Sequence, residues 1–189
     1  MTVQALRNIY QIKVTLKDTT PPIWRRLRVQ SDIKLKKLHV ALQIALGWTD
    51  SHMHQFISGS EYYGTPDPDF DFDCKPESKA KLDDLLKKEK ASIIYEYDFG
   101  DGWEHKIVLE KILPFTKDFK APVCLKGVGA CPPEDCGGPY GYRNLLEVLS
   151  NSSHPEHAEM VEWLGCDDFD PNFFDIDDVN EGLKINCRC

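Results

Sequence analysis

The stretch from Ile93 to Glu110 reads Ile-Ile-Tyr-Glu-Tyr-Asp-Phe-Gly-Asp-Gly-Trp-Glu-His-Lys-Ile-Val-Leu-Glu. Two runs of β-branched and aromatic residues flank a turn over 98–102, a pattern that predicts a β-hairpin. The turn also concentrates reactive side chains, because Asp98, Asp101 and His105 lie close together in the sequence. We therefore expect the rest of the chain to be organised around this hairpin.

A second hairpin is predicted near the start of the chain. Residues 9–16 and 23–29 alternate apolar and polar side chains with the period of two that is typical of half-buried strands. The segment 18–22 between them is rich in turn residues, and its prolines must lie outside a central ladder.

An amphipathic helix is predicted over 34–46, where apolar residues recur along one stripe. Ser31 or Asp32 is positioned to cap its N-terminus, and Gly47 ends it. A short strand over 53–58 follows. The opening order is therefore β-β-α-β, which also suits a β-grasp-like arrangement.

The remainder of the chain alternates irregular segments with short helices. Gly, Pro and Asp are frequent over 60–78 and 114–138, and we expect both to be loops. Apolar spacing predicts helices over 82–88, 142–149 and 155–164, with a last helical turn over 179–183.

These elements predict an α+β fold with a mostly antiparallel sheet, built from the two hairpins and the strand at 53–58, and a helical C-terminal part. At 189 residues the chain is long enough for one full hydrophobic core. We expect a single domain over 1–189, in which helices within 140–184 pack on a sheet-containing core over 7–114.

The chain is acidic, with 23 Lys and Arg against 31 Asp and Glu and a formal net charge of −8. Nucleic-acid binders gain affinity by neutralising phosphates, so nonspecific DNA binding is not expected. The basic residues gather in the N-terminal third. We interpret Arg25, Arg26 and Arg28 as a solvated strand face; docking of an acidic partner or a phosphate is the alternative.

The opening residues lack the apolar core of a signal peptide, and no apolar run is long enough to span a bilayer. We therefore expect a cytoplasmic protein with no membrane partner. In a reducing compartment its seven cysteines are expected to be free thiols or metal ligands rather than disulfides.

Several long motifs stand out along the chain: Pro21-Pro-Ile-Trp-Arg-Arg-Leu27, Leu38-His39 with Gly47-Trp48, His52-Met-His-Gln-Phe56, Tyr95-Glu-Tyr-Asp-Phe-Gly-Asp-Gly-Trp-Glu-His105, Cys131-Pro-Pro-Glu-Asp-Cys-Gly-Gly-Pro-Tyr-Gly-Tyr142 and His154-Pro-Glu-His157. In this order they resemble the family named after open reading frame three of a root-inducing plasmid. The resemblance runs from Tyr10 to about Leu183 and implies an α+β domain. Members of that family often carry the label of a TnpR-type passenger protein of insertion elements, which implies an association with mobile elements.

The TnpR label also implies recombination, which the residues disfavour. A serine recombinase holds the scissile phosphate with an arginine cluster around a nucleophilic serine. Ser31 follows three arginines, but it is better explained as a helix cap. A tyrosine recombinase needs a His-x-x-Arg motif, which the chain lacks. Nucleotide-binding glycine loops, Gly-x-Ser-x-Gly elbows and His-Glu-x-x-His helices are also missing from the sequence.

The first candidate site is the turn with Asp98, Asp101 and His105. These side chains can pair a carboxylate with an imidazole or supply oxygen and nitrogen ligands to a metal. The alternative is turn chemistry alone, because Asp before Gly favours left-handed and Asx-turn geometry. His52 and His54 face the same way on a predicted strand, which is compatible either with a ligand pair or with an ordinary polar face.

The second candidate is the loop over 131–142, where Glu134 and Asp135 precede two glycines that let a ligand approach the backbone. Tyr142 follows at the start of a predicted helix, whose N-terminus attracts anions. The alternative is a rigid cover over the core.

Zinc or another divalent metal is the cofactor that the residue types suggest. Cys131, Cys136, His154 and His157 could supply four zinc ligands, although their spacing departs from that of ordinary zinc fingers. An absence of any cofactor is the alternative.

The leading functional hypothesis is a soluble binding or interaction module for a small molecule or a protein partner. Its polar pocket would form where the 98–105 turn meets the 131–142 loop. The alternative is a metal-dependent hydrolase that uses the same carboxylates with His52, His54 or His105. The sequence leaves open whether the protein is an enzyme.

Overall fold

The structure is a computed structural model that describes residues 7–66, 74–166 and 168–187. The strands are β1 (Asn8–Leu16), β2 (Trp24–Gln30), β3 (His54–Ser58), β4 (Glu61–Gly64), β5 (Lys75–Pro76), β6 (Ser92–Tyr97), β7 (Trp103–Pro114) and β8 (Val123–Val128). The helices are α1 (Leu35–Leu46), α2 (Leu82–Leu85), α3 (Gly138–Leu149), α4 (His157–Leu164) and α5 (Ile176–Asn186). The strands form one eight-stranded sheet in the order β5-β4-β3-β6-β7-β1-β2-β8, which confirms the α+β prediction.

Both predicted hairpins are present, and they lie next to each other in the sheet. β6 and β7 pair antiparallel from Ser92 opposite Val108 to Tyr97 opposite Trp103, so the turn at 98–102 closes the ladder. The other edge of β7 pairs with β1, which in turn pairs with β2. Every ladder is antiparallel except the short one between β4 and β5.

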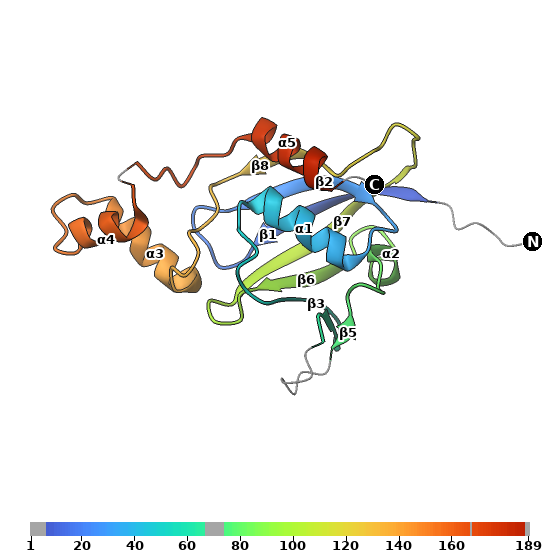
Figure 1. The fold of residues 1–189 in the computed structure, drawn as a ribbon, viewed down its shortest axis with the longest axis horizontal. Helices are drawn as coiled ribbons and strands as arrows, with labels where there is room; N and C mark the ends of the chain where they lie inside the picture. Colours follow the sequence, from blue (N-terminus) through green and yellow to red (C-terminus); the bar gives the residue numbers. More distant parts are fainter. Residues whose placement is uncertain (1–6, 67–73, 167, 188–189) are drawn as a thin grey trace, which may run out of the picture.

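The opening β-β-α-β order does not form a self-contained unit. β3 pairs with β4 and β6 rather than with either strand of the first hairpin. α1 lies across one face of the sheet (Figure 1). Its leucines at 35, 38, 42 and 46 are buried against the sheet, and each such side chain stabilises the fold by roughly 1.5–3 kcal/mol.

The predicted cap of α1 was wrong. Lys34 occupies the cap position and makes no side-chain capping bond. The Ser31 hydroxyl instead accepts a hydrogen bond from the backbone N–H of Asn8 and lies 3.4 Å from an Asp83 carboxylate oxygen. Its hydroxyl therefore ties β1 to the α2 segment.

Both predicted loops contain strands. β4 and β5 lie in the 60–78 segment, of which 67–73 are outside the described residues. β8 lies in the 114–138 segment and pairs with β2 at the edge of the sheet. Cys124 is its one buried side chain, so β8 lacks the alternation that would have revealed it. Pairing with an existing edge, rather than a local pattern, makes this segment a strand.

All five described helices differ from the prediction at one or both ends, and α1 and α4 differ only in beginning at Leu35 and His157. α2 stops at Leu85. α3 begins at Gly138 because Pro139 fits a first helical turn. α5 extends over Ile176–Asn186, and the Asp175 side chain caps it by accepting hydrogen bonds from the N–H groups of Asp177 and Asp178.

Arg25 was also misassigned to a solvated face. Its side chain is 2% exposed, and its guanidinium donates hydrogen bonds to four backbone carbonyls: Trp24, Ala45, Val128 and Gly129. Burial lowers its pKa to about 10, so it still carries a charge near pH 7. The guanidinium supplies the hydrogen bonds that water would otherwise give to carbonyl groups of β2, α1 and the end of β8. Arg28 faces solvent as predicted.

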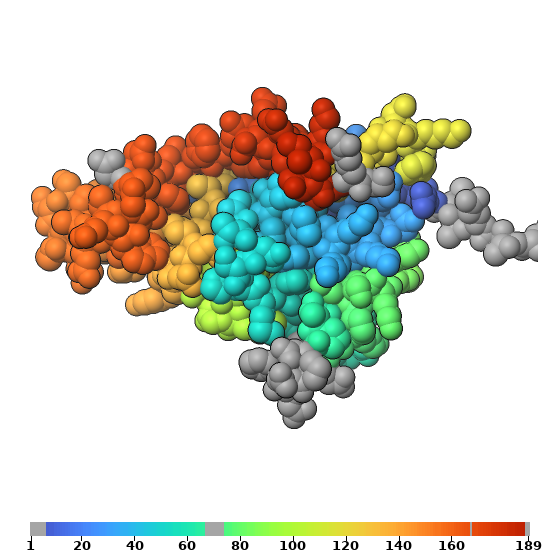
Figure 2. Space-filling model, viewed as in Figure 1, coloured from blue at the N-terminus to red at the C-terminus, as the bar shows by residue number. Residues whose placement is uncertain are grey.

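The C-terminal helices take two positions. α5 contacts α1 and β8, whereas α3 and α4 form a hairpin that projects at one end of the sheet (Figures 1 and 2). α3 buries Gly138, Tyr142, Leu145 and Val148, and α4 has no fully buried residue. None of the described helices combines the length and the apolar character needed to cross a bilayer.

Candidate functional site

Three segments bring four polar side chains together, which we call the junction cluster: His52, Asp98, Glu134 and Asp135. Nε2 of His52 lies 3.8 Å from Oε2 of Glu134 and 3.3 Å from Oδ1 of Asp135. Nδ1 of His52 lies 3.7 Å from Oδ2 of Asp98. The imidazole therefore has carboxylates on both ring nitrogens.

Glu134 is held in place by one of its two oxygens. Oε1 accepts hydrogen bonds from the backbone N–H and the hydroxyl of Thr49 and from the hydroxyl of Tyr97, all at 3.0–3.1 Å. Burial raises the pKa of Tyr97 well above its usual value, so its hydroxyl remains a donor. Oε2 is buried and, within the described residues, has no hydrogen-bond partner. The same is true of Nε2 of His52.

Asp98 has both a turn role and a role in the cluster. Its φ of 56° is left-handed, and its Oδ1 accepts hydrogen bonds from the backbone N–H groups of Gly100 and Asp101. This is the Asx-turn geometry that the sequence predicted as the alternative to a functional site. Its other oxygen is the one that faces His52.

Asp101 and the glycines of the loop form the junction between the two predicted segments. Oδ2 of Asp101 accepts a hydrogen bond from the N–H of Gly137 at 3.1 Å. A Cβ atom at Gly138 would lie 2.3 Å from the carbonyl oxygen of Asp101, so only glycine permits this approach. The turn and the loop therefore meet, and Asp101 tethers them rather than lining the cluster.

His105 lies in the core and not in the junction cluster. Its side chain is fully buried, its Nδ1 lies 3.1 Å from the carbonyl oxygen of Tyr95, and its ring meets Trp48 edge-on. Burial lowers its pKa to about 4, so it is neutral near pH 7. The signal was present in the sequence, because His105 shares strand parity with the buried Trp103 and Ile107.

His54 belongs to a second group, which we call the histidine-pair cluster: His39, Asp50, His54 and Glu77. His52 and His54 therefore belong to different sites. His52 precedes β3, and His54 is its first residue. Burial, followed by the neighbouring His54 ring, lowers the pKa of His39. Burial raises the pKa of Glu77, but hydrogen bonding and attraction to the two histidines outweigh this effect and lower it overall. Glu77 is therefore an ionised, buried carboxylate.

The four zinc-ligand candidates are not gathered into one site. Within the described residues, the groups of three or more metal-ligand side chains are parts of the junction and histidine-pair clusters. Burial raises the pKa of Cys131 far above its usual value and that of Cys136 to about 12, so both are thiols. Nδ1 of His154 accepts a hydrogen bond from the N–H of Glu156 in the turn before α4. His157 begins α4, on the projecting helical hairpin.

Tyr142 lies in the hydrophobic core rather than in the junction cluster. Its ring is 1% exposed and meets Phe169 edge-on, and burial raises its pKa to about 12.

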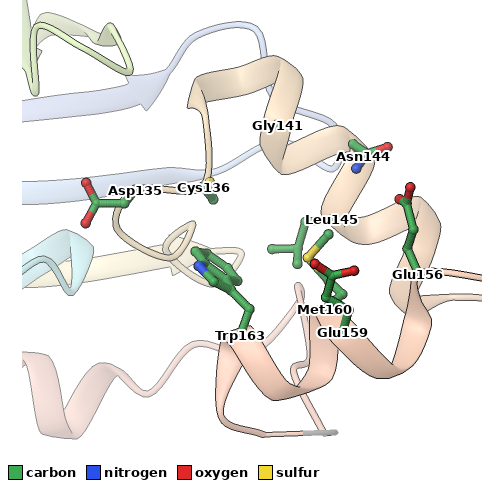
Figure 3. Close-up of a pocket in the computed structure, with 9 residues that line it drawn as sticks. All are labelled: Asp135, Cys136, Gly141, Asn144, Leu145, Glu156, Glu159, Met160 and Trp163. Carbon is green, nitrogen blue, oxygen red and sulfur yellow. The ribbon is translucent and has the colours of Figure 1, made fainter.

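A cleft of about 360 Å³ lies between α3 and α4 (Figure 3). Leu145, Met160 and Trp163 supply its apolar surface, and Glu156 and Glu159 add carboxylates. The 131–142 loop contributes Asp135, Cys136 and Gly141, but the 98–105 turn contributes no residue. Figure 3 shows the Asp135 carboxylate directed away from both helices, and that carboxylate lies against His52. The loop therefore separates the cleft from the junction cluster.

Sequence reasoning missed His39, Asp50, Glu77 and the two supporting residues Thr49 and Tyr97. Apart from the adjacent Thr49 and Asp50, these residues come from segments that are distant in the sequence, and no local spacing relates them. Strand parity could have placed Tyr95 and Tyr97 on the covered face with Ile93.

The fold and the two clusters define an α+β protein with a polar site beside an antiparallel sheet. The chain belongs to the plasmid pRiA4b ORF-3-like protein family, whose model matches residues 8–178, and this confirms the family that the motifs indicated. It is 37% identical over 177 residues to the uncharacterized protein y4hQ of Sinorhizobium fredii, covering 93% of this chain and 91% of that protein. Its fold matches the crystal structure of the protein of unknown function MM3350 from Methanosarcina mazei Go1. That match has a TM-score of 0.81 and 39% identity, and it covers 92% of this chain and 98% of the other.

Proposed function

We propose that the protein is a binding module whose junction cluster takes up a divalent cation. The observation that carries this proposal is the pair of buried atoms Nε2 of His52 and Oε2 of Glu134, which face each other without hydrogen-bond partners in the described part of the chain. A buried polar atom without a partner costs about 1–3 kcal/mol, so such a pair indicates a missing ligand.

The distances suit a cation better than a direct hydrogen bond. At 3.8 Å the two atoms are too far apart for that bond. Two ligands that each lie about 2.0–2.2 Å from one ion are separated by about 3–4 Å. One donor atom from each of His52, Asp98 and Asp135 lies within 4.8 Å of the others. Glu134 adds a carboxylate oxygen on the side of Nε2 of His52.

A ligand would reach the bound cation from solvent rather than from the cleft between α3 and α4. Asp135 lines that cleft with Cys136, but its carboxylate points away from the two helices (Figure 3). The Asp135 side chain is 73% exposed, so a bound ion would keep open positions toward solvent. A small molecule or a peptide side chain can complete those positions.

The test is titration of metal-free, full-length protein with Mn²⁺, Mg²⁺ and Zn²⁺. Calorimetry measures the affinity, and native mass spectrometry counts the bound ions. Glu134→Gln and His52→Gln should each weaken binding at this site by about tenfold or more, because a coordinating group is lost. Glu147→Gln, on the exposed face of α3, and His157→Gln are the matched controls and should bind like the wild type. Unchanged affinity in both cluster variants contradicts the proposal.

A metal-dependent hydrolase remains the alternative, since a cation with open positions can activate water. Turnover of generic ester or phosphoester substrates by the metal-loaded protein, lost in Glu134→Gln, would favour the enzyme over the binding module. The recombinase activity implied by the TnpR label stays disfavoured. An association with mobile elements would not by itself specify what the site binds. The Ser31 hydroxyl accepts a hydrogen bond from β1, and Arg25 donates to backbone carbonyls. Ser31 is therefore not arranged as a nucleophile, and Arg25 is not free to hold a phosphate.

A further inference from the structure

The histidine-pair cluster places two imidazole rings face to face. The centroids of His39 and His54 are 3.4 Å apart, with an angle of 4° between the ring planes. His39 comes from the middle of α1 and His54 from the start of β3, so only the packing of the helix on the sheet brings them together. His39 is 3% exposed, and the side chain of His54 is 12% exposed.

Each imidazole also faces a carboxylate through Nε2. Nε2 of His39 lies 2.7 Å from Oδ1 of Asp50, and Nε2 of His54 lies 2.9 Å from Oε2 of Glu77. Glu77 is 2% exposed, and among the described residues its other hydrogen bond is a 3.4 Å contact from the Thr65 hydroxyl. In the described part of the chain, the ion pairs of both carboxylates are with these histidines, and none is with a lysine or an arginine.

When both imidazole rings are neutral, hydrogen bonding alone leaves the carboxylates of Asp50 and Glu77 without a positively charged partner. If each neutral ring donates one N–H to its carboxylate, two negative charges remain beside two stacked rings, and one of the carboxylates is buried. A buried charge requires compensation, because its transfer from water costs several kcal/mol. A divalent cation supplies two positive charges at the point where nitrogen and oxygen donors converge.

We infer that His39, His54 and Asp50 form a second cation site, distinct from the junction cluster, which binds a first-row divalent metal such as Zn²⁺, with Glu77 as the balancing carboxylate. One donor atom from each of the three ligand residues lies within 4.8 Å of the others. Two imidazoles and a carboxylate are a donor set that suits Zn²⁺ and its first-row neighbours better than Mg²⁺ or Ca²⁺. Coordination of one ion by both imidazoles requires one ring to rotate out of the parallel stack, because a nitrogen lone pair lies in the plane of its own ring.

A set of hydrogen bonds around the site fixes its ligands. The Tyr95 hydroxyl lies 2.8 Å from Nδ1 of His39 and accepts a hydrogen bond from the Gln43 side-chain amide. The side-chain oxygen of Gln43 accepts a hydrogen bond from the backbone N–H of Asp50. Gln43 therefore connects the segment that carries Asp50 to the tyrosine that orients His39. Such outer contacts typically change metal affinity by about 10- to 100-fold when removed.

Stoichiometry separates this inference from the proposed function, on which it does not depend. The probe is Zn²⁺, titrated into metal-free, full-length protein and counted by native mass spectrometry. If both sites exist, the wild type binds two equivalents, and His54→Gln and His52→Gln each retain one. If only the second site exists, the wild type binds one equivalent, which His54→Gln loses and His52→Gln retains.

Asp50→Asn provides a variant that should fold like the wild type, because the Asp50 side chain is 57% exposed. We expect it to weaken Zn²⁺ binding at this site about tenfold or more, with an unchanged thermal unfolding midpoint. X-ray absorption of the His52→Gln protein loaded with one equivalent should show two imidazole ligands. Zn²⁺ stoichiometry and affinity that match the wild type in both His54→Gln and Asp50→Asn would overturn the inference.

Discussion

Nε2 of His52 and Oε2 of Glu134 face each other at 3.8 Å, while the second oxygen of Glu134 accepts three hydrogen bonds. Glu134 is therefore fixed on one side and open on the other. This asymmetry allows substitutions at Glu134 to separate the structural role of the side chain from its proposed binding role.

Glu134→Gln keeps a side-chain oxygen for Thr49 and Tyr97, so we expect the free energy of unfolding to change by less than about 1 kcal/mol. Glu134→Ala removes that acceptor and should destabilise by about 1–3 kcal/mol. Both variants should lose cation affinity. Urea unfolding of the metal-free proteins gives the comparison. Equal destabilisation by Gln and Ala would show that the hydrogen bonds to Oε1 do not hold the loop.

Gly138→Ala should destabilise the protein strongly, because its Cβ would lie 2.3 Å from the Asp101 carbonyl oxygen in addition to a positive φ of 68°. Gly165→Ala is the matched control: its φ is 75°, but nothing lies within 4 Å of the added Cβ. The control should show only the backbone cost of about 1–2 kcal/mol. We expect Gly138→Ala to exceed it by at least about 1 kcal/mol in urea unfolding. Similar values would mean that the turn and loop do not approach as described.

Arg25→Lys should destabilise by about 2–5 kcal/mol, because an ammonium group cannot reach the four carbonyls that the guanidinium fork satisfies. Arg28→Lys, at an exposed position of the same strand, should change stability by less than about 0.5 kcal/mol. Thermal and urea unfolding of the two variants test the assignment. A mild effect at Arg25 would return it to the solvated face that its sequence context suggested.

His105 should make stability depend on pH. Burial lowers its folded-state pKa to about 4, against about 6.5 in an unfolded chain, so the unfolded state binds more protons between these values. Stability should therefore fall as the pH drops from about 6.5 to 4, by up to about 3 kcal/mol from this group. NMR titration of the ring and urea unfolding at pH 7 and 4.5 check this, with His105→Gln as the variant lacking the effect. A ring that titrates near pH 6.5 in the folded protein would contradict it.

Tight nonspecific binding to duplex DNA is not expected near physiological salt. The chain carries a net charge of −8, and Arg25 is unavailable to phosphates because its guanidinium is buried. Fluorescence anisotropy with a labelled duplex at several salt concentrations measures this directly. Submicromolar affinity with a steep salt dependence would show that residues 25–37 form a phosphate-binding surface after all.

The elements that were predicted correctly are those whose sequence patterns extend over only a few neighbouring residues. The alternation in β1, β2, β6 and β7, the Asp-Gly turn at 98–102 and the apolar stripe of α1 depend on residues a few positions apart. The sequence also identified the two segments that meet, because Asp, Gly and Pro in both indicated unusual backbone geometry. Asp98 and Gly138 have the positive φ angles that this chemistry allows.

Whether a polar side chain became a core residue, a tether or part of a cluster was decided by tertiary structure. His105 and Arg25 each share strand parity with apolar neighbours, but their burial follows from the distant surfaces that cover those strand faces. The histidine-pair cluster joins α1, β3 and two connecting segments, so its spacing exists only after the helix packs on the sheet. The physical reason is that periodicity and turn chemistry act within a few residues, whereas burial and the convergence of charges depend on which distant surface covers each face.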